Sequence, residues 1–132
     1  MAVAGKYSFV YCGGVGLGSG WFIVEQDGTF KCGDIANSTC SGTAREEADG
    51  WIALELEMTI PAGTRLVQGT AAQDLPYSRN FRGRLPPLFG DGYPRQITFG
   101  PGEVTIMVKR VPDDSELQLI SAHLWKAALK PE

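Results

Sequence analysis

Histidine, cysteine and positive charge are all scarce in this chain. Its 132 residues include one histidine and three cysteines, and 12 Lys and Arg stand against 15 Asp and Glu, for a net charge of −3. Nucleic-acid binding normally requires a cationic surface, so this balance argues against a nucleic-acid partner. Cys12, Cys32 and Cys40 lack metal-binding spacing, and the single His123 has no Cys or acidic ligand at such a spacing. We therefore expect no metal and no cofactor, and a surface or interface position for His123.

Long apolar runs are also missing, and we expect no signal peptide. No run approaches the roughly 18 consecutive apolar residues of a membrane-spanning helix. Lys6 and Ser8 interrupt the stretch where the apolar core of a signal peptide would lie. We therefore expect a cytoplasmic location and no membrane association. In a reducing compartment the three cysteines are expected to be free thiols, with a disulfide between two of them as the alternative.

Recognised catalytic and phosphate-binding motifs are absent as well. There is no G-x-S-x-G elbow, and any Ser–His or Cys–His pair would have to use the single histidine. The glycine-rich segment 13–20 has neither G-x-G-x-x-G spacing nor a following Gly-Lys-Ser/Thr, so we interpret it as a wide hairpin turn or bulge. Glu55 and Glu57 fall on the solvent parity of a predicted strand rather than in a cleft. The sequence thus predicts a protein that is not an enzyme.

What the chain has in quantity is alternation of apolar and polar residues. In residues 51–60 the apolar side chains of Ile52, Leu54, Leu56, Met58 and Ile60 share one parity, which is typical of a strand with one buried face. Seventeen glycines and eight prolines mark many turns, and Asp27-Gly28 is a strong hairpin signal. The predicted strands are residues 6–12, 21–25, 29–32, 38–44, 51–60, 77–85, 95–99 and 104–110, with a weaker one at 64–70.

These strands predict a mainly β, antiparallel up-and-down fold. No helical segment lies between them, and an open sheet of this size tends to close because closure removes exposed edges. We expect one domain over residues 1–132, with a roughly eight-stranded barrel at about 5–111. After Pro112 the apolar period changes to three and four residues, which predicts a C-terminal α-helix at about 116–129 that packs on the barrel wall or on a second subunit.

Several side chains are candidates for a ligand site inside such a barrel. Tyr7, Phe9 and Tyr11 share a parity that we assign to the interior, where they would line a pocket for an apolar ligand. Arg82 and Arg84, near Arg79 and Arg95 in sequence, would bind a carboxylate or phosphate if they point inward, and are merely solvated if they point outward. Asp34, where a strand breaks, is interpreted as a turn-forming carboxylate, with a ligand role as the alternative.

The order of glycine motifs in the first half resembles a bacterial protein family. The motifs are Gly5-Lys6-Tyr7, Gly18-x-Gly20, Asp27-Gly28, Gly33-Asp34-Ile35-Ala36 and Gly42. Over about residues 5–60 they resemble the GrlR-type negative regulators of type III secretion and their uncharacterised bacterial relatives. The resemblance implies a lipocalin-like barrel that forms a homodimer and binds a transcriptional activator through an exposed acidic tetrapeptide between the fourth and fifth strands.

The matching position in this chain holds Glu46, Glu47 and Asp49, with Ala48 between them. Two functional hypotheses follow. The first is a dimeric, non-enzymatic interaction module that binds a regulatory protein through this acidic turn. The alternative is a barrel that binds a small apolar or anionic ligand among Tyr7, Phe9, Tyr11, Arg82 and Arg84.

Overall fold

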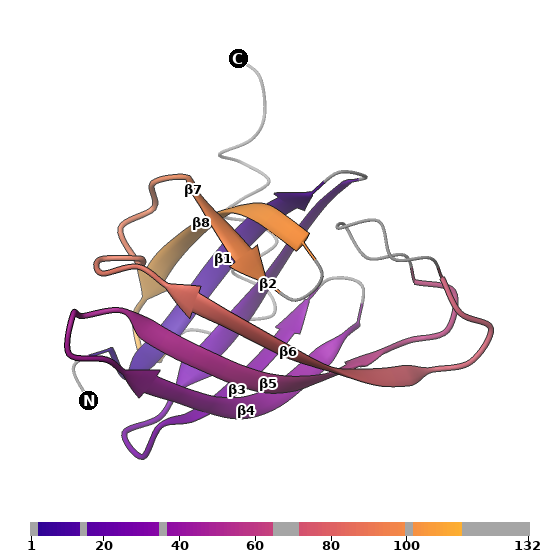
Figure 1. Cartoon of the computed structure of the whole chain (residues 1–132), viewed down its shortest axis with the longest axis horizontal. Helices are drawn as coiled ribbons and strands as arrows, with labels where there is room; N and C mark the ends of the chain where they lie inside the picture. Colours follow the sequence, from indigo (N-terminus) through magenta and orange to yellow (C-terminus); the bar gives the residue numbers. More distant parts are fainter. Residues whose placement is uncertain (1–2, 14–15, 35–36, 65–71, 100–101, 115–132) are drawn as a thin grey trace.

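The chain forms a closed barrel of eight antiparallel strands (Figure 1). The computed structural model describes residues 3–13, 16–34, 37–64, 72–99 and 102–114. Each strand pairs with the next in sequence, and the last pairs with the first, so the predicted up-and-down barrel is confirmed. The strands are β1 (Gly5–Gly13), β2 (Gly16–Val24), β3 (Thr29–Asp34), β4 (Thr39–Glu46), β5 (Ile52–Ile60), β6 (Tyr77–Leu85), β7 (Arg95–Phe99) and β8 (Gly102–Val111).

The helix predicted at 116–129, and with it His123, lies outside the described residues. So do residues 65–70, which make up nearly all of the weaker strand predicted at 64–70.

The pairing of β1 with β8 closes the barrel. It runs in register from Lys6 opposite Val111 to Cys12 opposite Thr105. The seam between β6 and β7 is shorter: within the described part of the chain, Gly83 opposite Phe99 is the one pair in register. The barrel wall is therefore continuous on the β1 side and loosest between β6 and β7.

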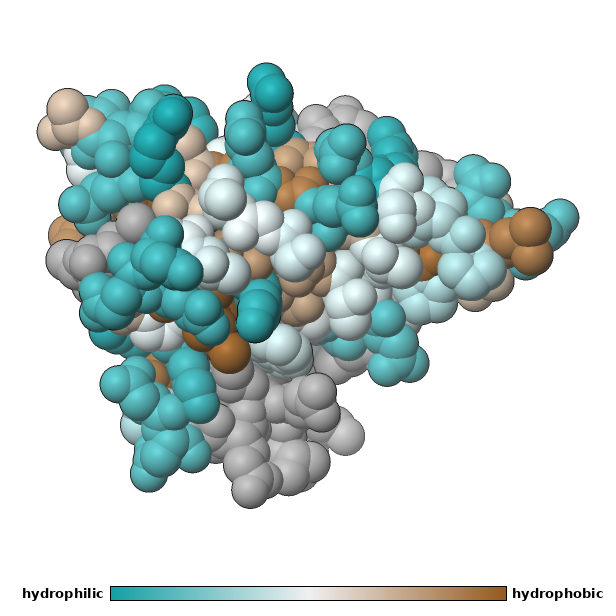
Figure 2. Space-filling model, turned by 90° about the horizontal axis from the view of Figure 1, so that it is seen from below, coloured by the Kyte–Doolittle hydropathy of each residue, from teal (hydrophilic) through white to brown (hydrophobic). Residues whose placement is uncertain are grey.

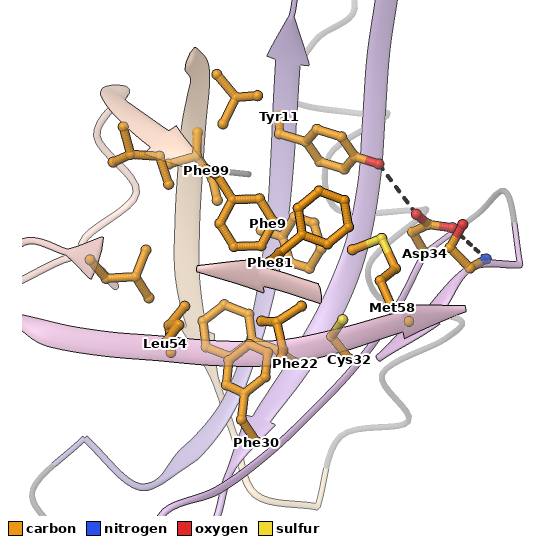
Figure 3. A pocket seen from close by; sticks show the side chains of 17 residues that line it. Phe9, Tyr11, Phe22, Phe30, Cys32, Asp34, Leu54, Met58, Phe81 and Phe99 are labelled. Carbon is orange, nitrogen blue, oxygen red and sulfur yellow. Dashed lines mark hydrogen bonds between the residues drawn. The ribbon is translucent and has the colours of Figure 1, made fainter. Parts of the chain in front are cut away.

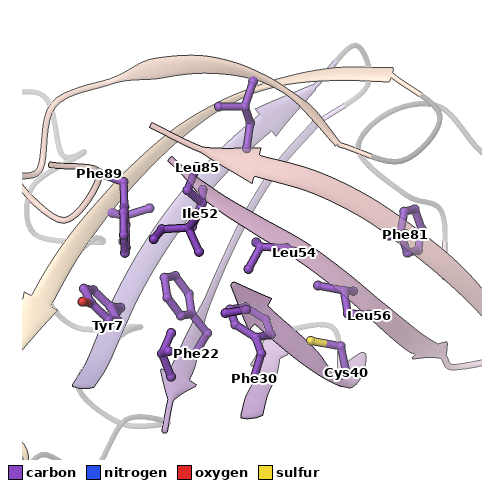
Figure 4. Packing of buried hydrophobic residues seen from close by; sticks show 14 of the residues in the cluster. Tyr7, Phe22, Phe30, Cys40, Ile52, Leu54, Leu56, Phe81, Leu85 and Phe89 are labelled. Atoms are coloured by element: carbon purple, nitrogen blue, oxygen red, sulfur yellow. The ribbon is translucent and has the colours of Figure 1, made fainter. Parts of the chain in front are cut away.

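Alternation along β5 works as the sequence predicts. Ile52, Leu54 and Leu56 are buried, whereas Glu55 and Glu57 are exposed on the outer face. Side chains of the other strands meet them inside the barrel, where aromatic residues and leucines form a continuous cluster (Figure 4). Burying one such side chain contributes about 1.5–3 kcal/mol, so this shared interior is the main source of stability.

The glycine-rich segment differs from its prediction as a turn, because most of it belongs to β2. Gly18 lies opposite Tyr11, and Gly20 lies opposite Phe9, within the β1–β2 ladder. A Cβ atom on Gly18 would lie 2.6 Å from Cζ of Tyr11, far inside van der Waals contact. At Gly18 the Tyr11 ring would have to shift, whereas a Cβ atom on Gly20 would overlap the backbone carbonyl oxygen of Gly33, so glycine is required at that position.

The Asp27-Gly28 hairpin is confirmed. Gly28 has a φ of 89° and donates its N–H to the carbonyl of Glu25 at 3.0 Å. A side-chain oxygen of Asp27 accepts the N–H of Thr29 at 2.9 Å. Glycine supplies the left-handed conformation and aspartate fixes the turn, so β3 returns antiparallel to β2.

Two of the three cysteines form a disulfide, so the prediction of free thiols is wrong for Cys32 and Cys40. They are directly opposite each other in the β3–β4 ladder, with Cα atoms 5.0 Å apart. Cys12 is free and exposed. The thiol prediction followed from the expected cytoplasmic location. Disulfides are more typical of oxidising compartments, and the location itself stays a prediction.

The outer surface is mostly hydrophilic on the face that Figure 2 shows, where hydrophobic residues appear only in separate small patches. The outer face of β1 differs from the solvent-exposed outer face of β5. Ser8 and Val10 have the outward parity but are only 1% and 2% exposed. The outer side of β1 is therefore buried, unlike the outer side of β5.

We predict that reducing the disulfide lowers the free energy of unfolding by about 2–3 kcal/mol. A loop this short, with a sequence separation of 8, restricts the unfolded chain by roughly that amount. Urea unfolding with and without dithiothreitol measures the change. Cys12→Ala is the matched control and should unfold like the wild type in both conditions. Equal stability of the reduced and oxidised protein would contradict the prediction.

Candidate functional site

The barrel interior is not completely filled. A cavity of about 90 Å³ lies in the lumen, and Figure 3 shows its lining. One water needs about 10–15 Å³ of such space, so the cavity accommodates a small molecule rather than a single solvent molecule. The lining residues are Phe9, Tyr11, Phe22, Phe30, Cys32, Gly33, Asp34, Ser38, Leu54, Leu56, Met58, Phe81, Leu85, Ile97, Phe99, Val104 and Ile106.

Aromatic pairs form much of the cavity wall. Phe22 stacks on Phe30 with ring centroids 5.1 Å apart, and Phe9 approaches Phe22 at 5.9 Å. From β6 and β7, Phe81 and Phe99 stack at 5.4 Å. Each such pair contributes about 0.5–1.5 kcal/mol beyond burial and fixes the ring planes. The walls are therefore preformed and apolar.

Three polar side chains gather at one end of the cavity. The Tyr11 hydroxyl donates to Oδ2 of Asp34 at 3.2 Å, and the N–H of Ser38 donates to Oδ1 of Asp34 at 3.0 Å (Figure 3). Ser38 is 3% exposed, and its Oγ has no hydrogen-bond partner. Asp34 and Tyr11 are half-buried, so this polar end lies towards solvent while the rest of the lining is apolar.

The β3–β4 connection holds Asp34 in place. The N–H of Asp34 donates to the carbonyl of Ser38, and the N–H of Asn37 donates to the carbonyl of Asp34, both at 3.1 Å. Asn37 adopts a φ of 66°, a conformation that asparagine tolerates better than most residues. The Cys32–Cys40 disulfide ties the same two strands just behind this turn. The prediction of a turn-forming Asp34 is confirmed, and the same carboxylate also lines the cavity.

The environment of Tyr11 keeps its hydroxyl protonated. Burial raises the pKa of Tyr11 well above its usual value of 10.0, and the charge of Asp34 and the hydrogen bond to it raise it further. Tyr11 is consequently a hydrogen-bond donor to Asp34 throughout the neutral range.

Of the three aromatic residues predicted to line a cavity, two line it and one belongs to the packed core. Phe9 and Tyr11 line it. Tyr7 also points inward but belongs to the packed core, where its ring lies 4.7 Å from that of Phe22 and 5.1 Å from that of Phe89. Its hydroxyl donates to the carbonyl of Val3. Tyr7 therefore supports the cavity wall without lining the cavity.

Arg82 and Arg84 do not line the cavity, so of the two alternatives the outward, solvated position applies and the ligand-binding hypothesis for them is dropped. Both side chains lie on the outer face of β6, where they are 85% and 50% exposed. Phe81 and Leu85 occupy the inward parity of the same strand. Arg82 pairs with Glu55 on the outside at 3.4 Å. The described residues that line the cavity include no Lys, Arg or His. Arg79, which has the same inward parity as Phe81, lies outside this lining, with its guanidinium 5.7 Å from the centre of the Phe81 ring.

Arg84 instead lies beside the acidic turn between β4 and β5. It binds Glu47 at 2.8 Å and Asp49 at 3.3 Å, and its guanidinium lies 4.7 Å from the centre of the Trp51 ring. Glu46 is exposed. The turn is on the surface as predicted, but Glu47 and Asp49 already have an intramolecular cation.

Sequence reasoning missed Ser38 and the far wall of the cavity. Ser38 stands in the predicted strand 38–44, but β4 begins at Thr39, so Ser38 ends the turn and faces the lumen. The short spacing between Asp34 and Ser38 across a strand break was the available signal. Phe81 and Phe99 come from distant strands, and only the closed barrel brings them to Phe9.

Comparisons with family models, curated proteins and solved structures find no match to this chain. The resemblance to GrlR-type regulators therefore stays a prediction. Within the described ranges there is no helix with the length and apolar character to cross a membrane. The same residues contain no cluster of three or more His, Cys, Asp or Glu side chains able to hold a metal ion.

We predict that Asp34→Asn lowers the pKa of Tyr11 by about one unit or more, because the substitution removes the neighbouring negative charge. Asparagine keeps an oxygen for the Ser38 N–H, so the turn is retained. Tyrosine ¹³Cζ shifts followed by NMR against pH measure the titration. Asp27→Asn, in the exposed β2–β3 turn, is the matched control and should leave Tyr11 unchanged. An unchanged pKa in Asp34→Asn would contradict the proposed contact.

The same shift sets a stability prediction at high pH. The folded pKa of Tyr11 is raised above the unfolded value of 10.0, so its contribution is fully present below pH 10 and is lost as pH rises towards the folded pKa. Asp34→Asn should make this alkaline loss end at a lower pH, as measured by urea unfolding at pH values above 10, since below pH 10 the contribution does not change.

Proposed function

We propose that this protein is a non-enzymatic barrel that binds a small ligand with an apolar body in its lumen. The observation that carries the proposal is the interior cavity of about 90 Å³, walled by phenylalanine, leucine and isoleucine side chains. Preformed apolar cavities with a few converging polar groups are the usual form of small-molecule sites. Barrels of about eight strands are the size that holds one small ligand, as in lipocalins. We extend the proposal to a lipocalin-like mode of binding.

Energetics favour an apolar ligand in this lumen. Removing apolar surface from water contributes about 2.5 kcal/mol per 100 Å², and an apolar cavity offers water few partners. A ligand the size of one ring gains this burial free energy but loses translational freedom on binding. We therefore expect dissociation constants on the order of millimolar for such small probes.

Binding of a regulatory protein at the acidic turn, and homodimer formation, stay predictions from the family resemblance. Arg84 neutralises part of the charge at Glu47 and Asp49, which weakens the case for that turn as a docking site. The ligand-binding proposal rests on the cavity alone and does not depend on it.

We predict that Leu54→Phe, which adds a ring to the cavity wall, weakens binding of benzyl alcohol at least tenfold. NMR chemical-shift titration of the wild type should give a saturable response at residues lining the lumen. Thr43→Phe places the same ring on the outer face of β4 and should bind like the wild type. If the shifts map to the outer surface, or if Leu54→Phe binds equally well, the lumen is not the site.

A further inference from the structure

We infer that the ligand carries a hydrogen-bond donor, a hydroxyl or an amine, directed at Ser38 and Asp34, and that carboxylate ligands bind more weakly. This inference rests on the proposed function and names the class of ligand that the same cavity selects. It depends on the polar end of the cavity, where the atoms of Tyr11, Asp34 and Ser38 converge.

Ser38 gives the first reason. Its Oγ is buried and lacks a hydrogen-bond partner, although the residue lines the cavity. Buried polar atoms are nearly always paired, because an unpaired one forfeits its hydrogen bonds to water. The N–H of the same residue is already held by Asp34. The free hydroxyl is therefore available to a polar group in the lumen.

Asp34 gives the second reason. A carboxylate accepts hydrogen bonds and repels anions. Oδ2 of Asp34 accepts the Tyr11 hydroxyl, Oδ1 accepts the Ser38 N–H, and the residue lines the cavity. None of the described residues that line the cavity is a Lys, Arg or His. A bound carboxylate would lose its hydration beside the like charge of Asp34, and the residues that line the cavity would supply no counter-charge. The guanidinium of Arg79 lies over the Phe81 ring, outside this lining. The anionic class of ligand that the sequence left open is thereby disfavoured.

Tyr11 completes the match. Its hydroxyl donates to Asp34, so its oxygen turns only acceptor lone pairs towards other groups. The polar end consequently offers oxygen acceptors from three residues and one rotatable hydroxyl. A ligand donor meets these acceptors, whereas an acceptor-only group finds a single partner in Ser38.

Four probes that share one ring test the inference at pH 7: toluene, benzyl alcohol, benzylamine and benzoate. We expect benzyl alcohol and benzylamine to bind at least threefold more tightly than toluene, and benzoate at least tenfold more weakly than benzyl alcohol, by NMR titration. Asp34→Asn should remove the disadvantage of benzoate and weaken benzylamine. Benzoate binding as tightly as benzyl alcohol, or toluene binding best, overturns the inference and leaves the proposed function intact.

Ser38→Ala separates a ligand contact from a structural role. Because Oγ makes no hydrogen bond within the protein, its removal should leave the urea midpoint unchanged or raise it, while benzyl alcohol binds about threefold more weakly. Ser41→Ala, at an exposed position of β4, should change neither quantity. A lower midpoint with unchanged affinity overturns the role of Ser38. Failure of all four probes to bind the wild type overturns the inference together with the proposed function.

Discussion

Backbone pairing between the first and last strands is the constraint from which the remaining structure follows. The β1–β8 ladder removes both edges of the sheet, and an eight-stranded sheet joined in this way encloses a lumen of fixed width. Side chains of inward parity from every strand then share one interior. Phe9 and Tyr11 of β1 face Phe81 and Phe99 of β6 and β7 only because the cylinder is closed. An open sheet of the same strands would have no such cavity.

Within that cylinder, backbone without side chains makes room for aromatic rings. Gly18 and Gly20 leave the inner wall of β2 bare, and the rings of β1 occupy the space. Planar rings cover the wall without filling the centre, which leaves an apolar void. The β3–β4 turn, tied by the disulfide, then places Asp34 and Ser38 at the rim of that void. The packing of the β1 rings over the glycines of β2 therefore shapes both the barrel wall and the cavity.

The fold could largely be predicted from the sequence, and the site only in part, through Phe9, Tyr11 and Asp34. Alternation in residues 51–60 specified β5 and its buried face, because apolar and charged side chains there differ strongly. The glycines at the start of β2 show no alternation of apolar and polar side chains, so this part of the strand was interpreted as a turn. In β6, Gly83 has no side chain at the inward position between Arg82 and Arg84. The alternation there was therefore too weak to show which way Arg82 points. The Cys32–Cys40 disulfide was considered only as an alternative, because the expected cytoplasmic location favours free thiols. Ser38 acquired its role only from the point at which β4 begins.

A hollow apolar lumen is the claim on which the functional account stands, and xenon tests it most directly. Xenon enters dry apolar cavities of this kind and scatters strongly. A crystal pressurised with xenon should show a peak inside the barrel between Phe22, Leu54 and Phe81, which line the cavity from three different strands. A barrel whose centre is filled by its own side chains, with xenon found only on the outer surface, would contradict the account.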